Sequence, residues 1–393
     1  MTKRILFVDD EPRILEGLER LLFSCADGWD MSFAPGGQAA IDVLEQQSFD
    51  VLVTDMRMPG IDGPALLRYA QARHPNLVRI VLSGHTEFEV ALRTMPIAHQ
   101  FLCKPCDAKT LMDVLERAVN LQRLVTDEVV RGLVGSIVDL PARPRVYSEL
   151  TMALSDDNVP VDRVVGIIEQ DVGISSKVLH LVNSAFFSPK RPIMNVRAAV
   201  VRLGMNTLRH LVLSIEVFHG SNKVTSDFSM DAESRHALHV GAVARKLLER
   251  GAADDAFLAG MLHDVGTLLL ATKLPEYFAS VQSEARASGR SATEVELELR
   301  GVTHAEIGAY LLGLWGMPYP IVEAVANHHS VDRNRGRGWS IATAVQVANL
   351  LVREASDHDD AAASALDDGM LSALGVDLDL ERWRTFAAGI STE

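Results

Sequence analysis

The first 104 residues alternate between short apolar runs and segments in which apolar residues recur every three or four positions. Apolar runs of strand length occupy residues 5–8, 51–53, 80–82 and 101–102. A helical period follows the first of them, at Ile14, Leu15, Leu18, Leu21 and Leu22. Because strand and helix alternate, the pattern predicts an α/β domain built on a doubly wound parallel sheet.

Polar residues stand at or near the carboxyl ends of these predicted strands. They are Asp9, Asp10, Asp55, Ser83 and Lys104. Ligands of such sheets bind outside the carboxyl ends of the strands, so we expect these side chains to meet at one edge. Clustered carboxylates stay ionised together only when a cation joins them, and hard oxygen ligands suit Mg²⁺. A carboxylate beside Mg²⁺ can attack a phosphoryl group, while a hydroxyl and an ammonium neutralise its oxygens, which are the roles expected for Ser83 and Lys104.

The character of the chain changes after about residue 127. A helix predicted over 107–124 places Leu111, Leu115 and Val119 on one face. The stretch 107–136 is nearly unbroken and could continue as one helix that transmits a change at Phe101. Beyond it the strand-like runs disappear, and apolar residues recur at helical spacing. We therefore predict an all-α region with a core of its own.

Histidines gather in this second region, where seven of the thirteen follow residue 230. Six metal-ligating side chains occupy the starts or ends of successive predicted helices: His236, His263, Asp264, His304, His328 and His329. Imidazoles with a carboxylate are typical ligands of transition metals, so the set is a candidate site for a divalent ion, real or vestigial. Two alternatives stay open. A buried histidine is commonly a satisfied core residue, and His239 could take the place of His236.

Composition fits two or three folded domains, since 48% of the 393 residues are apolar and 23% are charged. A net charge of −14 argues against a large nucleic-acid-binding face, and the basic run 333–337 reads as a solvated loop. No charged segment precedes an apolar leader, and no apolar run approaches the length of a membrane span. Three cysteines fit a reducing compartment, and a cytoplasmic location without membrane attachment is expected.

Four segments of the first region resemble the receiver domain of bacterial response regulators. They read FVDDEPRIL at 7–15, VTDMRMPGIDG at 53–63, LSGH at 82–85 and FLCKPCD at 101–107. The resemblance covers residues 1–123 and implies a five-stranded, flavodoxin-like sheet. It also implies a two-component system, in which a sensor histidine kinase or a phosphotransfer protein supplies the phosphoryl group.

The same resemblance implies a role for each polar residue of the predicted edge. Asp55 would be the phosphorylated residue, and it would hold Mg²⁺ together with Asp9, Asp10 and the main-chain carbonyl of Arg57. Contacts to the phosphoryl group would come from Ser83 and Lys104, and Phe101 would be the aromatic switch residue.

The order His, His-Asp, His, His-His resembles the HD superfamily of metal-dependent phosphohydrolases, including the HD-GYP phosphodiesterases of cyclic di-GMP. Two features depart from that pattern. The Gly-Tyr-Pro signature is missing after His329, where the chain reads SVDRNRGRGW, and Asn349 stands where an aspartate ligand is expected. Asparagine is a neutral and weaker ligand. The departures favour a domain without catalysis.

Residues 130–345 resemble the HDOD domain, a regulatory relative of the HD enzymes, on text such as IIEQDVGISSKVLHLVNSAFFS at 167–188 and FLAGMLHDVGTLLL at 257–270. We expect a receiver at 1–123, a helical linker at 124–138, an HDOD domain at 139–345 and a helical extension at 346–393. The implied output is a non-catalytic signalling module controlled by Asp55, with a metal-dependent phosphodiesterase as the alternative. Expected partners are an unidentified downstream protein and cyclic-dinucleotide signalling proteins; a homodimer stays open, and no DNA-binding domain is expected.

Overall fold

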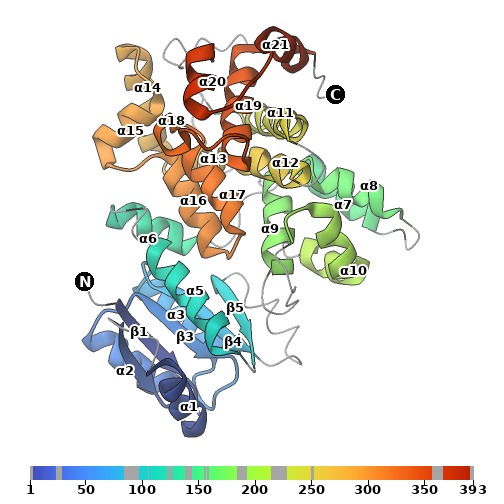
Figure 1. The fold of residues 1–393 in the computed structure, drawn as a ribbon. Coiled ribbons are helices and arrows are strands. Elements are labelled where there is room, and N and C mark those ends of the chain that lie inside the picture. Colours follow the sequence, from blue (N-terminus) through green and yellow to red (C-terminus); the bar gives the residue numbers. More distant parts are fainter. Residues whose placement is uncertain are drawn as a thin grey trace. The chain divides into compact units, whose positions relative to one another are not determined.

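The computed structural model divides the chain into two compact units, one holding residues 1–139 and the other most of the remainder (Figure 1). It describes residues 3–23, 29–83, 97–104, 106–121, 125, 127–137, 144–154, 156, 159–183, 193–213, 228–248, 252–355 and 366–389. Each unit is considered by itself.

A parallel sheet of five strands, in the order β2-β1-β3-β4-β5, forms the centre of the first unit. The strands are β1 (Lys3–Val8), β2 (Trp29–Ala34), β3 (Val51–Asp55), β4 (Val78–Ser83) and β5 (Gln100–Cys103). Strands β1, β3 and β4 lie inside the sheet and are covered on both faces, which is why they read as unbroken apolar runs. The predicted doubly wound α/β fold is confirmed. The apolar pattern of the sequence did not predict strand β2, because β2 is an edge strand in which only Ala34 is fully buried.

The described helices of this sheet domain are α1 (Pro12–Phe23), α2 (Gly37–Gln46), α3 (Gly63–Arg73) and α5 (Ala108–Leu121). Helix α3 begins where the Asp62 carboxylate accepts the Ala65 N–H, with a proline in its first turn. Helix α5 buries Leu111, Leu115 and Val119 as one apolar stripe, as the sequence predicted.

The prediction of one helix over 107–136 is wrong. Helix α5 ends at Leu121, and a separate helix, α6 (Glu128–Ser136), begins after Asp127. Asp127 has an extended backbone, and its carboxylate accepts the N–H groups of Val129 and Val130 at 2.8 and 3.0 Å. Such a cap ends the helical path on its N-terminal side, so α5 and α6 do not form one rigid rod.

Helix α6 is anchored at the amino-terminal ends of β4 and β5. Arg79, which is 1% exposed, donates to the carbonyls of Ile97 and Gly135, both at 2.6 Å. The ring of His99 accepts the Arg79 N–H at Nδ1, which leaves its Nε2–H to donate to the Gly135 carbonyl at 3.0 Å. A Cβ at Gly135 would lie 2.1 Å from the Pro75 carbonyl, so this close approach requires glycine.

The second unit is built from helices alone among its described residues, which confirms the all-α prediction. They are α7 (Pro144–Leu154), α8 (Val161–Ile168), α9 (Val172–Asn183), α10 (Val196–Leu213), α11 (Met230–Leu247), α12 (Ala253–Leu262), α13 (Val265–Lys273), α14 (Pro275–Ser288), α15 (Ala292–Arg300), α16 (His304–Leu314), α17 (Tyr319–Asn327), α18 (Val331–Asn334), α19 (Ile341–Ala355), α20 (Asp368–Leu374) and α21 (Leu380–Ala388). Helix α19 packs against α11, α12 and α17, and its Val345, Ala348 and Leu351 are fully buried.

Two surface features bear on the function. The arginines of the basic run are each ion-paired: Arg333 with Glu306, Arg335 with Asp332 and Arg337 with Glu323, at 2.8 to 3.1 Å. Within the described part of the chain no single helix has both the length and the apolarity to cross a bilayer. Two consecutive helical segments, Ala253–Lys273 and Pro275–Ser288, have sufficient length and apolarity only when taken together, and they are bent by 115° relative to each other.

Candidate functional sites

The carboxyl-terminal edge of the sheet brings three of the predicted residues into direct contact. Asp9 follows β1, Asp55 ends β3, and Lys104 follows β5. The Lys104 ammonium donates to Asp9 Oδ2 at 2.7 Å and also to Asp55 Oδ1. Asp9 is 2% exposed, whereas the Asp55 side chain is 13% exposed. One carboxylate is therefore held inside, and the other remains open to a reaction partner.

The other predicted residues of this edge lie around that contact. The Arg57 N–H donates to Asp55 Oδ2 at 2.8 Å, which fixes the orientation of the carboxylate. Asp10 is exposed beside Asp9. Ser83 ends β4 next to Cys103 of β5, and Phe101 is buried within β5. His85, the last residue of the LSGH segment at 82–85, lies outside the described residues.

Burial and charge act in opposite directions on the two contacting groups. Burial raises the pKa of the Asp55 carboxyl above its usual value, and the hydrogen bond from Lys104 offsets part of that shift. Burial alone would lower the pKa of Lys104, but its hydrogen bonds to Asp55 and Asp9 outweigh burial and raise it. Lys104 is therefore a permanent ammonium at neutral pH, as a group that neutralises phosphoryl oxygens must be.

The predicted histidines and Asp264 form one buried cluster in the second unit. His263 ends α12, Asp264 precedes α13, His304 begins α16 and His328 ends α17, so helix termini supply most of the set. His236, on α11, is the ring that faces the cluster, and the alternative of His239 finds no support in these contacts.

A glycine lets the termini of α13 and α16 meet at this cluster. A Cβ at Gly266 would lie 1.9 Å from the His304 carbonyl, so no other residue fits there. The close approach places His304 within 3.3 Å of the Asp264 carboxylate.

Asp264 divides the cluster into two subsites, one at each carboxylate oxygen. The first subsite comprises His236, His263, Asp264 Oδ2 and Asn349. The second subsite comprises Asp264 Oδ1, His304, His328 and His329. Asn349 thus lies at the cluster, where the resemblance to the HD superfamily leads one to expect an aspartate ligand. Its Oδ1 is 3.0 Å from His236 Nε2.

The donor chemistry of the cluster fits a cation. The Nδ1 atoms of His263 and His328 lie 2.6 and 2.7 Å from the carbonyls of Gly260 and Val325. Carbonyl oxygens only accept hydrogen bonds, so these Nδ1 atoms carry the ring protons, and the Nε2 lone pairs point to Asp264 at 3.0 and 3.3 Å. Both Nε2 atoms and Asp264 Oδ1 make no hydrogen bond to any described residue. Lone pairs converging on a carboxylate repel one another unless a positive ion lies between them.

Glu296, on α15, holds the fourth ring in place. It is 4% exposed, and it accepts both the backbone N–H of His304 and the ring Nδ1–H, each at 2.8 Å. His304 therefore turns Nε2 toward Asp264. A carboxylate behind a ligating histidine fixes its tautomer and strengthens it as a ligand.

The protonation of the cluster differs from ring to ring. Burial opposes charge on His304, but Glu296 and Asp264 raise its pKa to about 10. Burial lowers the pKa of His328 to about 4 and, together with His263, that of His236 to about 3. The pKa of Asp264 lies well below its usual value, because the histidines outweigh its burial. Without a bound ion, the proton on His304 is thus a positive charge that faces Asp264.

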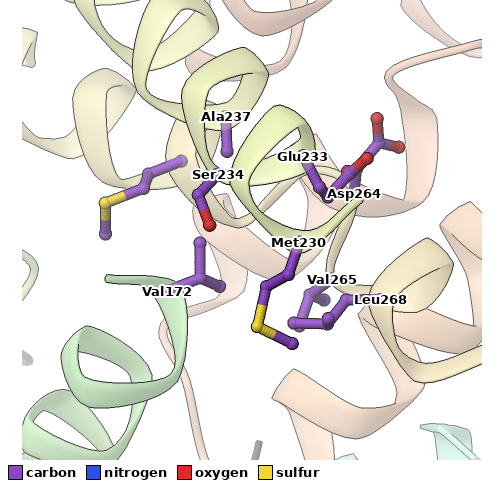
Figure 2. Close-up of a pocket in the computed structure, with 9 residues that line it drawn as sticks. Val172, Met230, Glu233, Ser234, Ala237, Asp264, Val265 and Leu268 are labelled. Atoms are coloured by element: carbon purple, nitrogen blue, oxygen red, sulfur yellow. The ribbon is translucent and has the colours of Figure 1, made fainter. Parts of the chain in front are cut away.

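A small recess lies beside Asp264, between α11 and α13. Its walls are mainly apolar, with Met230, Val265 and Leu268 among them, and its volume is about 20 Å³, which holds about one water molecule. Figure 2 shows Glu233 next to Asp264 at this recess. Glu233 Oε1 is buried without a hydrogen bond to any described residue, and burial together with Asp264 raises its pKa to about 8.

Three residues that border the cluster were missed by sequence reasoning: Glu233, Glu296 and Arg353, whose terminal nitrogen lies 3.9 Å from Asp264 Oδ2. Glu233 precedes His236 by three positions and Arg353 follows Asn349 by four, so both lie on the helical face of a predicted ligand. That periodicity was a usable signal. Glu296 comes from a different helix than His304, and no local spacing identifies it.

The cluster makes the stability of the metal-free protein sensitive to acid. In the unfolded chain His236 and His328 titrate near 6.5, whereas in the folded chain their pKa values are about 3 and about 4. Only the unfolded chain gains these protons below pH 6.5, so the stabilisation is complete above that pH and falls as pH drops toward 4. His304 is protonated in both states over this range and contributes no slope.

We expect His236 and His328 each to contribute a fall of roughly 1.4 kcal/mol per pH unit to the free energy of unfolding of chelator-treated protein between pH 6 and 5. The raised pKa of Glu233 contributes in the opposite direction, so the change in slope on substitution is the quantity to compare. Urea titrations at several pH values measure this slope. In His328→Gln the slope should decrease by about one proton; an unchanged slope would contradict the assignment.

Two protein-family models match the chain, the response regulator receiver domain over residues 5–116 and the HDOD domain over residues 140–331. An uncharacterized protein of Treponema pallidum is 26% identical over 249 residues, 61% of this chain and 47% of that protein. The DNA-binding transcriptional regulator NtrC of Klebsiella pneumoniae is 34% identical over 114 residues, 29% of this chain and 24% of NtrC. The chain thus spans less than half the length of each of these relatives, and DNA binding is a property of NtrC.

Two solved structures share the fold. The MmoQ response regulator of Methylococcus capsulatus aligns with a TM-score of 0.51 at 22% identity, covering 63% of this chain and 98% of that one. A virulence factor of Campylobacter jejuni aligns with a TM-score of 0.51 at 16% identity, covering 67% and 98%. From both family matches and the fold, the chain belongs to the response regulators, with a receiver domain at residues 5–116 followed by an HDOD domain at residues 140–331.

Proposed function

We propose that the chain works in a two-component phosphorelay, in which Asp55 accepts a phosphoryl group and the HDOD domain responds as a non-catalytic signalling module. A sensor histidine kinase or a phosphotransfer protein would be the donor. The observation that carries the first half is the Lys104 ammonium, bonded to both Asp9 and Asp55 at the carboxyl ends of three strands. This is an arrangement of a nucleophile with a fixed positive charge beside it.

In the proposed transfer, a carboxylate oxygen of Asp55 attacks the phosphorus while the bond from phosphorus to the donor's nitrogen breaks. Asp9, Asp10, Asp55 and the Arg57 carbonyl would hold a Mg²⁺ ion, which supplies charge neutralisation to the phosphoryl oxygens when bound. Lys104 is within reach of Asp55 and would exchange its bond to the carboxylate for one to the new phosphoryl group. Ser83 would contribute its hydroxyl from the end of β4.

The restricted space around the histidine cluster supports a non-catalytic output. His263, Asp264, His304 and His328 are each at most 6% exposed. The recess beside Asp264 holds about one water molecule, far less than a nucleotide needs. Catalytic metal sites keep an open position for substrate, whereas closed sites are structural.

A second candidate function is a metal-dependent phosphohydrolase of the HD type. The observation that favours it is the assembly of the His and Asp side chains around one shared carboxylate. The two functions are separated by assaying cyclic di-GMP hydrolysis with added Mn²⁺ or Fe²⁺. We expect no turnover; metal-dependent turnover that is lost in both His263→Ala and Asp264→Ala would establish the hydrolase instead.

Irrespective of catalysis, we propose that the cluster can bind a divalent transition metal, with Glu296 as a positioning residue. Glu296→Gln keeps the acceptor for the His304 N–H but removes the negative charge behind the ring. Affinity for Co²⁺ should fall by about 10- to 100-fold. Equilibrium dialysis in excess Mg²⁺, which competes for the receiver, measures it.

The matched control is Glu298→Gln, an exposed position on the same helix that bonds to Arg290. It should leave Co²⁺ affinity unchanged. If both variants and the wild type bound Co²⁺ with equal affinity, Glu296 would have no role in positioning a metal ligand.

A further inference from the structure

We propose that the HDOD domain binds a single transition-metal ion, at the second subsite, and that the guanidinium of Arg353 replaces an ion at the first. The inference rests on the metal binding proposed above, and it adds the number and the position of the ions. It is carried by the contacts of Arg353 with both oxygen donors of the first subsite.

Arg353 lies on α19, one turn after Asn349. Its Nε donates to Asn349 Oδ1 at 3.2 Å, and one terminal nitrogen lies 3.9 Å from Asp264 Oδ2. The Arg353 side chain is 28% exposed, so it is partly withdrawn from solvent. A permanent positive charge therefore faces the same two oxygens that an ion at this subsite would use.

The Arg353 contact also decides which atom of Asn349 points to His236. A guanidinium nitrogen only donates, so the atom facing it must be the side-chain oxygen. That oxygen is also 3.0 Å from His236 Nε2, which must then carry the ring proton and donate it. A protonated Nε2 has no lone pair to offer. Arg353 thus holds His236, through Asn349, in a tautomer that cannot bind a metal through Nε2.

At the second subsite no side-chain amide of the described residues holds the ring nitrogens that face Asp264. His328 holds its ring proton on Nδ1 against the Val325 carbonyl, and His304 does so against Glu296, so both Nε2 atoms face Asp264 Oδ1 at 3.3 Å. Glu296 also adds a second carboxylate behind this subsite. Both subsites share the Asp264 carboxylate. At the second subsite the charge of Glu296 behind His304 adds to it, whereas at the first subsite Asp264 is accompanied by a neutral amide and a repelling guanidinium.

The test counts ions per chain. Full-length protein is dialysed against Co²⁺ in excess Mg²⁺, so that Mg²⁺ occupies the receiver, and bound cobalt is measured by elemental analysis. Wild type should bind one Co²⁺. Asn349→Asp combined with Arg353→Ala should bind two, because it restores a carboxylate and removes the competing charge. Arg335→Ala, which alters an exposed ion pair elsewhere in the domain, should stay at one.

Two ions in the wild type, or one in the double variant, would overturn the assignment of Arg353. No ion in the wild type would overturn it together with the proposed metal capacity, while phosphorylation of Asp55, measured separately, would stand. Arg353→Met keeps roughly the length of the side chain without its charge, and it replaces the double variant if that variant fails to fold. It should bind more than one Co²⁺ per chain. Spin-coupled Mn²⁺ signals in the wild type would also contradict a single ion.

Discussion

Asp55→Asn is expected to abolish covalent phosphorylation of the chain, a loss of at least about 100-fold in the phosphorylated fraction. The amide oxygen can still accept the hydrogen bond from Lys104, so the fold of the edge should persist. An amide is neutral, however, and it is a far poorer nucleophile than a carboxylate, so the phosphorus is not attacked. Intact-mass spectrometry after incubation with acetyl phosphate and Mg²⁺ measures the fraction that gains one phosphoryl group.

Asp42→Asn is a suitable comparison, because Asp42 lies on α2 and accepts a hydrogen bond from Gln38 one turn earlier on the same helix. It should be phosphorylated like the wild type. A phosphoryl group that still appears on Asp55→Asn would place the acceptor elsewhere. Omitting Mg²⁺ should also suppress the reaction in wild type; full phosphorylation in a chelator would exclude the proposed ion.

Arg79→Ala is expected to destabilise the first unit by about 3 kcal/mol and to release α6. The substitution removes the buried hydrogen bonds from Arg79 to the Ile97 and Gly135 carbonyls. The Gly135 carbonyl keeps its bond from His99, whereas an unsatisfied Ile97 carbonyl costs about 1–3 kcal/mol. The shortened side chain also leaves a cavity. Urea unfolding gives the change in free energy, and amide hydrogen exchange over 128–136 reports the release of the helix.

Arg68→Ala, an exposed arginine on α3, provides the control and should unfold within about 0.5 kcal/mol of wild type. Exchange over 128–136 that stays as slow in Arg79→Ala as in Arg68→Ala would mean that α6 is held by its apolar face instead. In that case Val130 and Val134, both fully buried, would be the residues to replace.

Local sequence patterns predicted most of the sheet, because strands that are buried on both faces consist of unbroken apolar runs. The exception is β2, whose exposed edge position leaves an alternation too weak to read. The break between α5 and α6 was signalled by Asp127, a strong capping residue, but the flanking apolar period concealed it. In the histidine cluster the named side chains do converge. Glu296 could not be assigned, because its role comes from hydrogen bonds between two helices that sequence spacing does not encode. Arg353 lies one helical turn after Asn349, so its position could have been inferred from the spacing.

Strand β5 joins two features described separately. Lys104 at its carboxyl end holds Asp55, and His99 just before its first residue bonds to the Gly135 carbonyl of α6. Four residues separate them, so the five steps from His99 to Lys104 span only about 17 Å. Lys104 and His99 thus lie at opposite ends of one strand, one at the edge that holds Asp55 and one at α6. The strand that carries the hydrogen-bond partner of Asp55 is therefore also the strand that holds α6.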